Sequence, residues 1–373
     1  MARSGILLAG RFDAFEKQGG DTVQMLETAA ALVRRGRVAR VTTELEPQLG
    51  GVELMHLFNW TRIGETAHRL ALARRAGVPC VVTPIHQELA EYDARGRRGI
   101  GRWAARWLGR EGLEQARVVV HATRNPAMRR VAARQLAGGY GALQRQVLVG
   151  CRAVIFASEG ERRALEATGA EPVLARVVPL GISPEFRDAT PQTWHARHPA
   201  RDFVLCAARV EDLKNQLALL EALHGISVPV VFAGDLNPSH RAYGRDFVRA
   251  VAARPDTFHL PALDRPSLAS AMAAARVHAL PSWAENVGLA SLEAAAAGAA
   301  VVSTDRGHLR EYLGDQARYC DPGDLGSIRR AVLAALEDGR KEALRGPTAA
   351  RFSWDHTAEL LDSLYEQVLG VVA

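Results

Sequence analysis

The sequence has little cysteine and no long apolar run. Its four cysteines are scattered, form no Cys-x-x-Cys pair and are not grouped with histidine: Cys80, Cys151, Cys206 and Cys320. This spacing excludes a disulfide framework and a zinc site of common design, so we expect buried thiols in a reducing cytoplasm. No stretch reaches the roughly 18 uncharged apolar residues of a membrane-spanning helix, and the apolar run at residues 6–9 is too short for a signal peptide.

Two short motifs are also missing. Gly-x-Gly-x-x-Gly does not occur, which argues against an enzyme that uses a nicotinamide dinucleotide. Asp-x-Asp does not occur either, so nothing visible in the sequence requires a divalent metal, and we predict no metal site. The 373 residues are more than one compact core usually holds, which predicts two domains.

Arginine accounts for most of the positive charge, and the net charge is +6. The densest run lies close to Trp103 and Trp107 and consists of Arg95, Arg97, Arg98, Arg102, Arg106 and Arg110. Two interpretations stay open: a solvated face, which we favour, or a surface that meets an anionic membrane or a phosphorylated acceptor. The other arginines are dispersed and not interleaved with aromatic residues, which argues against a nucleic-acid-binding protein.

Segments of strand length alternate with helical patterns, which predicts an α/β fold with parallel sheets. The strands expected from these patterns are residues 5–10, 52–58, 79–83, 117–121, 153–157, 203–207, 228–233, 277–280 and 299–302. A Pro- and Gly-rich segment at 181–199 predicts a domain boundary, with domains at 1–181 and 182–354. A helix with apolar residues at helical spacing follows over 355–373.

Residues 279–303 read as a strand end, a loop broken by Pro281 and Ser282, an alanine-rich helix over 287–297, a glycine stop and a buried strand. Glu285 precedes this helix and Glu293 lies two turns inside it. The backbone N–H groups at the helix start are unpaired and face the positive end of the dipole, which suits a phosphate. The residues expected to supply them are Asn286, Val287, Gly288 and Leu289. Two acids beside a phosphate site favour a nucleotide-sugar as ligand.

This stretch resembles the retaining glycosyltransferases of the GT-B fold, called group 1 or family 4. The matching positions are Pro281, Ser282, Glu285, Gly288, Glu293, Ala294 and Gly298. The chain departs from the family pattern at Asn286 and Val287, where the family usually has glycine and an aromatic residue. The resemblance implies two Rossmann-like domains that face a central cleft. It also implies that the C-terminal helix crosses back onto the N-terminal, acceptor-side domain.

The resemblance also implies roles for individual residues. Arg209 and Lys214 match Gly-Arg-x4-Lys, with Ala208 in place of the glycine, and in the family both cations bind the donor diphosphate. Glu285 is then the catalytic residue that orients the sugar, and Glu293 binds the ribose hydroxyls. Gly234 matches the glycine-rich strand end near the nucleotide.

Two further sites are expected in the first domain. His86 follows the strand at 79–83, where ligands of open α/β sheets collect, and in the family a histidine here contacts the donor sugar. Gly19 and Gly20 precede a helix and allow a phosphate or acceptor to approach the backbone closely. A loop without a role is the alternative at both places.

We therefore predict a metal-independent, retaining hexosyltransferase that moves a sugar from a nucleotide-sugar to an acceptor hydroxyl. The nucleotide-sugar is a substrate, so no cofactor is expected. A saccharide or lipid-linked acceptor is expected, in polysaccharide, O-antigen or glycolipid assembly. The enzyme is expected in the cytoplasm, with peripheral attachment to the inner membrane face left open. The alternatives are a nucleotide-sugar epimerase of the same fold and a basic protein that binds membrane or nucleic-acid surfaces.

Overall fold

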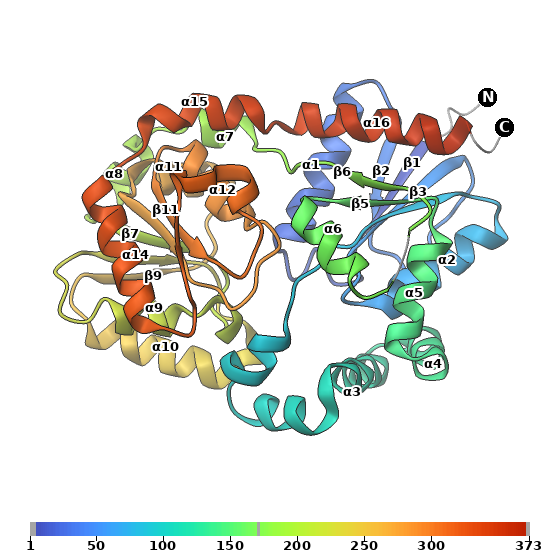
Figure 1. Ribbon diagram of the computed structural model, residues 1–373, viewed down its shortest axis with the longest axis horizontal. Helices are drawn as coiled ribbons and strands as arrows, with labels where there is room; N and C mark the ends of the chain where they lie inside the picture. Colours follow the sequence, from blue (N-terminus) through green and yellow to red (C-terminus); the bar gives the residue numbers. More distant parts are fainter. Residues whose placement is uncertain (1–4, 170–171, 371–373) are drawn as a thin grey trace. The chain divides into compact units, whose positions relative to one another are not determined.

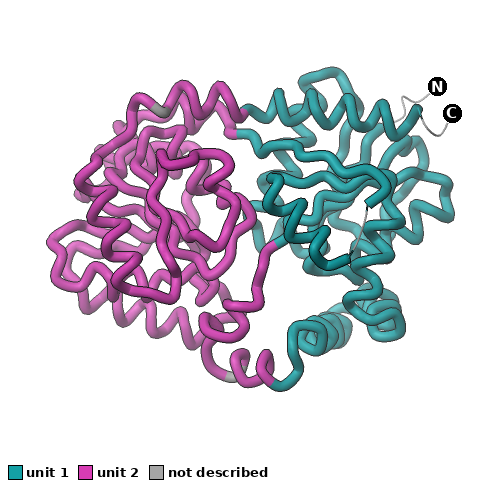
Figure 2. The backbone as a smooth tube through the Cα atoms, in the orientation of Figure 1, with its two compact units in different colours: residues 1–86, 107–181, 353–373 teal, residues 87–106, 182–352 magenta. Residues whose placement is uncertain are grey.

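The computed structural model describes residues 5–169 and 172–370 and divides into two units, each with a parallel six-stranded sheet (Figures 1 and 2). Unit 1 consists of the segment that ends at His86, the segment Trp107–Gly181 and the segment that begins at Ser353. Unit 2 consists of Gln87–Arg106 and Ile182–Phe352. Residues 87–106 therefore group with the second unit, although they interrupt the sequence of the first.

The sheet of unit 1 has the order β2-β1-β3-β4-β5-β6, and all its neighbouring strands are parallel. Its strands are β1 (Gly5–Ala9), β2 (Ala39–Thr42), β3 (Val52–Phe58), β4 (Cys80–Thr83), β5 (Ala153–Phe156) and β6 (Ala175–Val177). Strands β1, β4 and β5 are apolar without alternation and are buried along their whole length, as expected for strands covered on both faces.

The helices that carry unit 1 are α1 (Gly20–Arg34), α2 (Ile63–Arg75), α4 (Met128–Gly138), α5 (Tyr140–Gly150), α6 (Glu159–Glu166) and α16 (Trp354–Gly370). Helix α3 (Ile100–Arg124) begins in the segment of unit 2 and ends in unit 1, with a kink at Gly109. The Ser158 hydroxyl accepts the Glu161 N–H at 3.0 Å and so caps the start of α6.

The C-terminal helix α16 packs on α1 within unit 1, as the resemblance implied. Its Tyr365 hydroxyl lies 2.7 Å from Nδ1 of His56 on β3, and the other ring nitrogen of His56 lies 2.7 Å from the Thr83 hydroxyl. Both contacts are buried. Two ion pairs between Arg34 and Asp355 and between Arg37 and Asp362 add to this attachment.

The sheet of unit 2 has the order β12-β11-β10-β7-β8-β9 and is also parallel throughout. Its strands are β7 (Val204–Ala207), β8 (Val230–Ala233), β9 (Thr257–Leu260), β10 (Val277–Leu280), β11 (Ala300–Thr304) and β12 (Arg318–Cys320). Its main helices are α9 (Gln216–Ala222), α10 (Arg241–Ala253), α11 (Arg265–Ala274), α12 (Leu289–Ala296), α14 (Leu325–Asp338) and α15 (Glu342–Arg351).

Short helices connect these elements in unit 2. They are η1 (Tyr92–Gly96), α7 (Pro184–Arg187), α8 (Gln192–Arg197), η2 (Asp212–Lys214), η3 (Pro238–His240), α13 (Arg310–Leu313) and η4 (Gly314–Gln316). The Asp264 carboxylate accepts the Ser267 N–H, and Pro266 lies in the first turn of α11, so both residues favour the start of this helix.

The strand order fixes where each unit can hold a ligand. In unit 2 the chain runs from β7 out to β9 and then returns to the other side of β7 with β10. In unit 1 the same reversal occurs between β1 and β3. Ligands of open α/β sheets bind beyond the carboxyl ends of the strands at such a reversal. The loops after β7 and β10, and those after β1 and β3, are therefore the expected ligand-binding loops.

The predicted strand at 117–121 is wrong, because these residues belong to α3. In the helix, the three valines that favoured a strand lie on different faces. Val118 is buried against Met128 and Val131, whereas Val119 and Val120 are exposed. The four cysteines are buried free thiols, as expected. Burial raises the pKa of Cys80 and of Cys206 to about 12.

Candidate functional site

The loops after β7 and β10 lie side by side in unit 2. The Trp283 N–H donates to the Leu213 carbonyl at 2.8 Å, which ties the second loop to the first. The Glu285 N–H in turn donates to the Arg306 carbonyl in the loop after β11. Three successive strand ends are thus joined at one edge of the sheet.

Lys214 and Glu285 form an ion pair across these two loops. The ammonium nitrogen lies 2.5 Å from Oε1 of Glu285, and the two side chains are only 17% and 8% exposed. Asn215, in the left-handed conformation at φ 61°, follows Lys214 and turns the chain into α9. A cation and an acid that lie this close together and are shielded from water can stabilise charges of opposite sign that develop on a ligand.

Arg209 lies in the same loop but is less engaged. Its guanidinium is 3.7 Å from Glu211 and its side chain is 38% exposed. Its carbonyl accepts a hydrogen bond from the Gln216 side chain, which fixes the backbone at the start of α9. An arginine has five N–H donors, and one long ion pair leaves most of them for a phosphate.

The start of α12 carries unpaired polar groups. Gly288 takes the left-handed conformation at φ 83°, and its carbonyl accepts the Ser291 and Leu292 N–H groups. Three buried side-chain oxygens here have no hydrogen-bond partner among the described residues: Ser282 Oγ, Asn286 Oδ1 and Ser291 Oγ. Buried polar atoms are nearly always paired in folded proteins. A cluster of exceptions at the start of a helix therefore marks a place for a polar ligand.

Glu293 lies on α12 and is buried. Its Oε1 is 3.5 Å from Nη2 of Arg265, whose guanidinium also bonds to Glu185 at 2.7 Å and to the Ser183 hydroxyl at 2.8 Å. Arg265 was not identified as a site residue from the sequence. It positions the Glu293 carboxylate beside the helix start.

Gly234 has a packing role that the structure explains. Its φ is 152°, and a Cβ there would lie 2.1 Å from the Ala208 carbonyl oxygen. Only glycine lets the end of β8 approach the loop that carries Arg209 so closely. A contact between Gly234 and a nucleotide stays a prediction.

A segment that sequence reasoning missed covers the same loops. The Tyr92 hydroxyl donates to the Asp212 carboxylate, and the Arg98 N–H donates to the same carboxylate at 3.1 Å. Gly96 lies so close to the Trp283 ring that a Cβ would be 2.6 Å from it. We call residues 87–99 the strap. Because its partners are more than 100 residues away in sequence, no local pattern could have revealed it.

The strap is also attached to the loop after β11. The Arg306 guanidinium donates to Glu91 at 2.6 Å and lies 3.3 Å from Asp321. The strap therefore contacts the loops after β7, β10 and β11, all of which border the Lys214–Glu285 pair.

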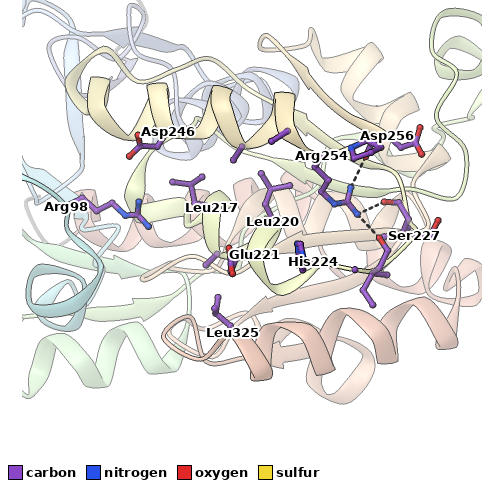
Figure 3. A pocket seen from close by; sticks show the side chains of 17 residues that line it. Arg98, Leu217, Leu220, Glu221, His224, Ser227, Asp246, Arg254, Asp256 and Leu325 are labelled. Atoms are coloured by element: carbon purple, nitrogen blue, oxygen red, sulfur yellow. Dashed lines mark hydrogen bonds between the residues drawn. The ribbon is translucent and has the colours of Figure 1, made fainter.

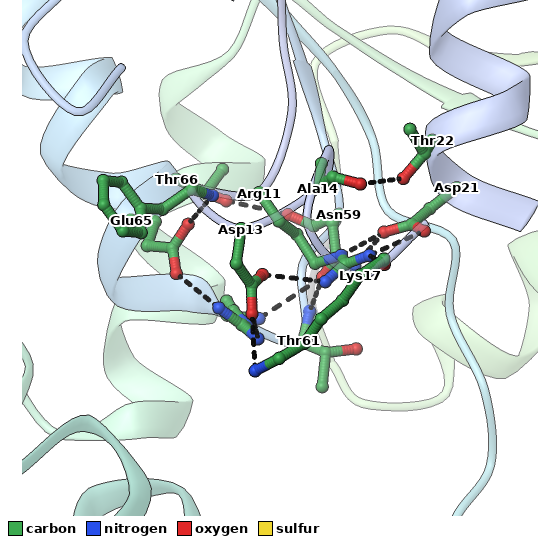
Figure 4. A network of polar contacts seen from close by, with 12 residues as sticks. Arg11, Asp13, Ala14, Lys17, Asp21, Thr22, Asn59, Thr61, Glu65 and Thr66 are labelled. Carbon is green, nitrogen blue, oxygen red and sulfur yellow. Dashed lines mark hydrogen bonds and ion pairs between the residues drawn. The ribbon is translucent and has the colours of Figure 1, made fainter. Parts of the chain in front are cut away.

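The strand reversal of unit 1 holds a charged network (Figure 4). Arg11 bonds to Asp13 and Asp21, and Arg62 bonds to Asp13 at 2.8 Å and to Glu65 at 3.3 Å. Burial would raise the pKa of Asp13, but the charges of Arg62 and Arg11 outweigh it and lower the pKa to about 2. The network keeps fixed charges at the sheet edge.

The three residues predicted in unit 1 border this edge. Gly19 lies at the N-cap position of α1 and Gly20 is its first residue. Asp21, in the first turn, bonds to Arg11. The His86 N–H donates to Glu161 at 2.6 Å, and its ring meets the edge of Trp60. The donor contact expected of His86 stays a prediction.

A groove of about 940 Å³ lies elsewhere in unit 2, along α9 and α10 (Figure 3). Leu217 and Leu220 line it from α9 and His224 from the turn after that helix. Arg254 closes one end by bonding to the carbonyls of Ile226 and Val228. These carbonyls precede β8, so that end lies at the amino edge of the sheet, opposite the Lys214–Glu285 pair. We assign no chemistry to this groove.

Among residues 5–169 and 172–370, no group of three or more His, Cys, Asp or Glu side chains is placed to hold a metal ion. No helix in this part of the chain is long and apolar enough to cross a membrane.

Known proteins resemble the chain in sequence. The family model described as "Glycosyl transferases group 1" matches residues 192–351. A D-inositol 3-phosphate glycosyltransferase from Xylanimonas cellulosilytica is 28% identical over 391 residues, which cover 94% of this chain and 92% of that protein. An O-antigen chain mannosyltransferase B from Escherichia coli is 35% identical over 102 residues, or 26% of each chain.

Solved structures resemble it along its whole length. Sucrose-phosphate synthase from Thermosynechococcus elongatus aligns with a TM-score of 0.74 and 16% identity, over 99% of this chain and 100% of that chain. Anabaena Alr3699/HepE in complex with UDP aligns with a TM-score of 0.67 and 16% identity, over 97% and 100% of the two chains. Likeness at this identity concerns the fold.

Proposed function

The chain belongs to the group 1 glycosyltransferases, also called family 4, and has the GT-B fold; on this premise we propose that unit 2 binds the donor and unit 1 the acceptor. It is an enzyme that transfers a sugar from a nucleotide-sugar. We further propose that transfer retains the configuration at the anomeric carbon and needs no metal or cofactor.

One observation carries the assignment of the donor site. The Lys214–Glu285 pair lies at the strand reversal of unit 2, and Glu285 shares its loop with the unpaired oxygens of Ser282 and Asn286. Lys214 and Arg209 hold the diphosphate, and the N–H groups at the start of α12, around residues 286–289, complete its binding. When the bond between sugar and phosphate breaks, negative charge builds on the diphosphate, and these fixed cations stabilise it.

The two acids contact the sugars of the donor. Glu285 orients the transferred sugar, and its carboxylate stabilises the positive charge that an oxocarbenium-like transition state places on the ring. Glu293, positioned by Arg265, accepts hydrogen bonds from the ribose hydroxyls. Both acids are buried, so their interactions are little screened by water.

Unit 1 contributes the acceptor side. His86 contacts the donor sugar from this unit, and the loop at Gly19 and Gly20 lets the acceptor approach the backbone. The Arg11–Asp13–Arg62 network supports this proposal, because fixed charged groups at a strand reversal can orient hydroxyl groups of a saccharide.

We propose a uridine diphosphate sugar as donor and a saccharide or lipid-linked acceptor. Structures of Anabaena HepE with UDP and with UDP-glucose share the fold, which supports the nucleotide. The names of the relatives, an inositol phosphate glycosyltransferase and an O-antigen chain mannosyltransferase, support a hydroxylated acceptor.

The test is a two-step assay on the purified protein. A thermal-shift screen of UDP, GDP, ADP and TDP selects the nucleotide, and the matching sugar donors are then incubated with and without candidate acceptors. We expect release of nucleoside diphosphate only when an acceptor is present. We also expect that the product, measured by NMR, has the same anomeric configuration as the donor. Conversion of the donor sugar without an acceptor would instead identify an epimerase.

A further inference from the structure

The first part of α3, before the kink at Gly109, exposes two large aromatic side chains. Trp103 is 65% and Trp107 is 79% exposed. They are four residues apart, so they lie on the same face of the helix. The next residue, Leu108, is also exposed. A patch of this kind is uncommon on a protein surface and indicates an interaction site.

The other tryptophans show that this exposure is not general in the chain. The sequence has six, and the remaining four are buried: Trp60, Trp194, Trp283 and Trp354. Each of these four packs in a core or against another element. Trp103 and Trp107 are therefore the exceptions among the six tryptophans, and both lie on the same helix.

Two arginines lie beside the tryptophans on the same helix. Arg102 and Arg106 are also four residues apart, and each precedes a tryptophan, so a row of guanidinium groups runs next to the row of indoles. Both arginines are exposed, and neither has an ion pair with another described residue. Residues 94–110 contain no aspartate or glutamate. The net charge of this face is therefore positive and not neutralised locally.

A solvated face would explain the arginines but not the tryptophans. Indole side chains lower their free energy when the ring leaves water while its N–H stays hydrated, which is the environment of lipid headgroups. Arginine beside them binds phosphate through several N–H donors. The combination fits an anionic lipid surface better than a nucleic acid, because Leu108 adds apolar surface that base stacking would not use.

We propose that the face formed by Arg102, Trp103, Arg106 and Trp107 docks the protein onto a bilayer that contains anionic phospholipid. The indole rings enter the headgroup layer and the guanidinium groups bind lipid phosphates. The helix lies in the plane of the surface and does not cross it. This inference uses none of the residues of the donor site, so it stands or falls separately from the proposed chemistry.

Vesicle sedimentation tests the proposal. The full-length protein is mixed with vesicles of pure phosphatidylcholine or of phosphatidylcholine with one quarter phosphatidylglycerol, at low and physiological salt. We expect binding to the anionic vesicles at least about 10-fold tighter than to the neutral ones, weakened by salt, with a blue shift of the tryptophan emission.

Two double variants and one matched control resolve the contributions. W103A/W107A and R102Q/R106Q should each weaken binding to anionic vesicles by about 10-fold or more. The control is R241Q/R245Q, an exposed arginine pair at the same spacing on α10, which should bind like the wild type. Circular dichroism and thermal unfolding verify that all variants are folded. Transfer to a short water-soluble acceptor should be unchanged.

Three results would overturn the proposal. The wild type could fail to bind either vesicle, the variants could bind as tightly as the wild type, or the control could weaken binding equally. Preferential binding of duplex DNA or heparin over anionic vesicles, lost in the same variants, would assign the face to a polyanion instead. None of these outcomes would affect the donor assay.

Discussion

Lys214 and Glu285 are the residues on which the proposed chemistry of the donor site rests. They are 71 positions apart in sequence, yet their charged atoms meet at 2.5 Å because β7 and β10 are neighbours in the sheet. Both side chains are largely buried, so each charge lowers the free-energy cost of removing the other from water. Glu285 lies in the loop just before the helix start where a phosphate is proposed to bind, so the ion pair keeps the Lys214 ammonium beside that loop.

Changing Glu285 to glutamine should separate catalysis from binding. The amide keeps the shape but cannot stabilise positive charge on the sugar, so we expect kcat to fall by about 100- to 1,000-fold. Nucleoside diphosphate should bind as well as before or better, because Lys214 loses a competing anion. Steady-state kinetics and calorimetry measure both, with Glu342→Gln, an exposed acid, as control. A kcat near that of the wild type would remove Glu285 from the mechanism.

Sequence reasoning could name these residues but not their surroundings. The order of loop, helix start and paired acids within residues 279–303 is local information, and so is the spacing of Arg209 and Lys214. Arg265 and Tyr92 were missed because their partners, Glu293 and Asp212, are brought near only by tertiary folding. The unpaired oxygens of the loop before α12 could not be foreseen for the same reason.

At the scale of elements, the sequence predicted most of the short buried strands correctly, but it did not predict α3. Its valines at 118–120 favour strand by residue type, but the helix buries only one of them. The tertiary contact of Val118 with α4 decided the outcome. The strap could not be predicted from the sequence either, because its grouping with unit 2 depends on contacts with loops far along the chain.

The strap gives a prediction about donor affinity. Tyr92→Phe removes the hydroxyl that donates to Asp212, two residues before Lys214 in the sequence, and loosens the strap over the loop after β7. We expect the KM for the donor to rise by about 3- to 10-fold with little change in kcat, because the strap contacts the loop and not the transferred sugar. Tyr319→Phe, whose hydroxyl bonds only to the Gly314 carbonyl among the described residues, serves as control. An unchanged KM would show that the strap does not support the donor site.

Helix α16 gives a prediction about stability. Tyr365→Phe leaves Nδ1 of the buried His56 without its partner, which should lower the free energy of unfolding by about 1–3 kcal/mol. Urea unfolding followed by circular dichroism measures the change, again beside Tyr319→Phe. If the variant were as stable as the wild type, the contact between α16 and β3 would not hold the helix in the way we describe.

For the molecule as a whole, stability should fall in mild acid. Burial lowers the pKa of His56 in unit 1 to about 3 and of His278 in unit 2 to about 4. In the unfolded chain both rings titrate near pH 6.5. Below that pH the unfolded state binds protons that the buried rings of the folded state do not bind. The contribution of the two neutral rings to the free energy of unfolding is therefore complete above about pH 6.5 and declines towards pH 4.

The measurement is the free energy of urea unfolding between about pH 7.5 and pH 5. His278 also lacks a hydrogen-bond partner among the residues described, so His278→Leu should flatten the decline without loss of stability at neutral pH. An equally steep decline in this variant would show that His278 does not stay neutral in the folded protein.

The central claim is that unit 2 holds the donor diphosphate with Lys214, Arg209 and the start of α12. Calorimetric titration of the preferred nucleoside diphosphate into the wild type, Lys214→Ala and the control Lys341→Ala tests it most directly. We predict that Lys214→Ala binds at least about 30-fold more weakly while remaining folded, and that the control binds like the wild type. Equal affinity of Lys214→Ala and the wild type would contradict the account.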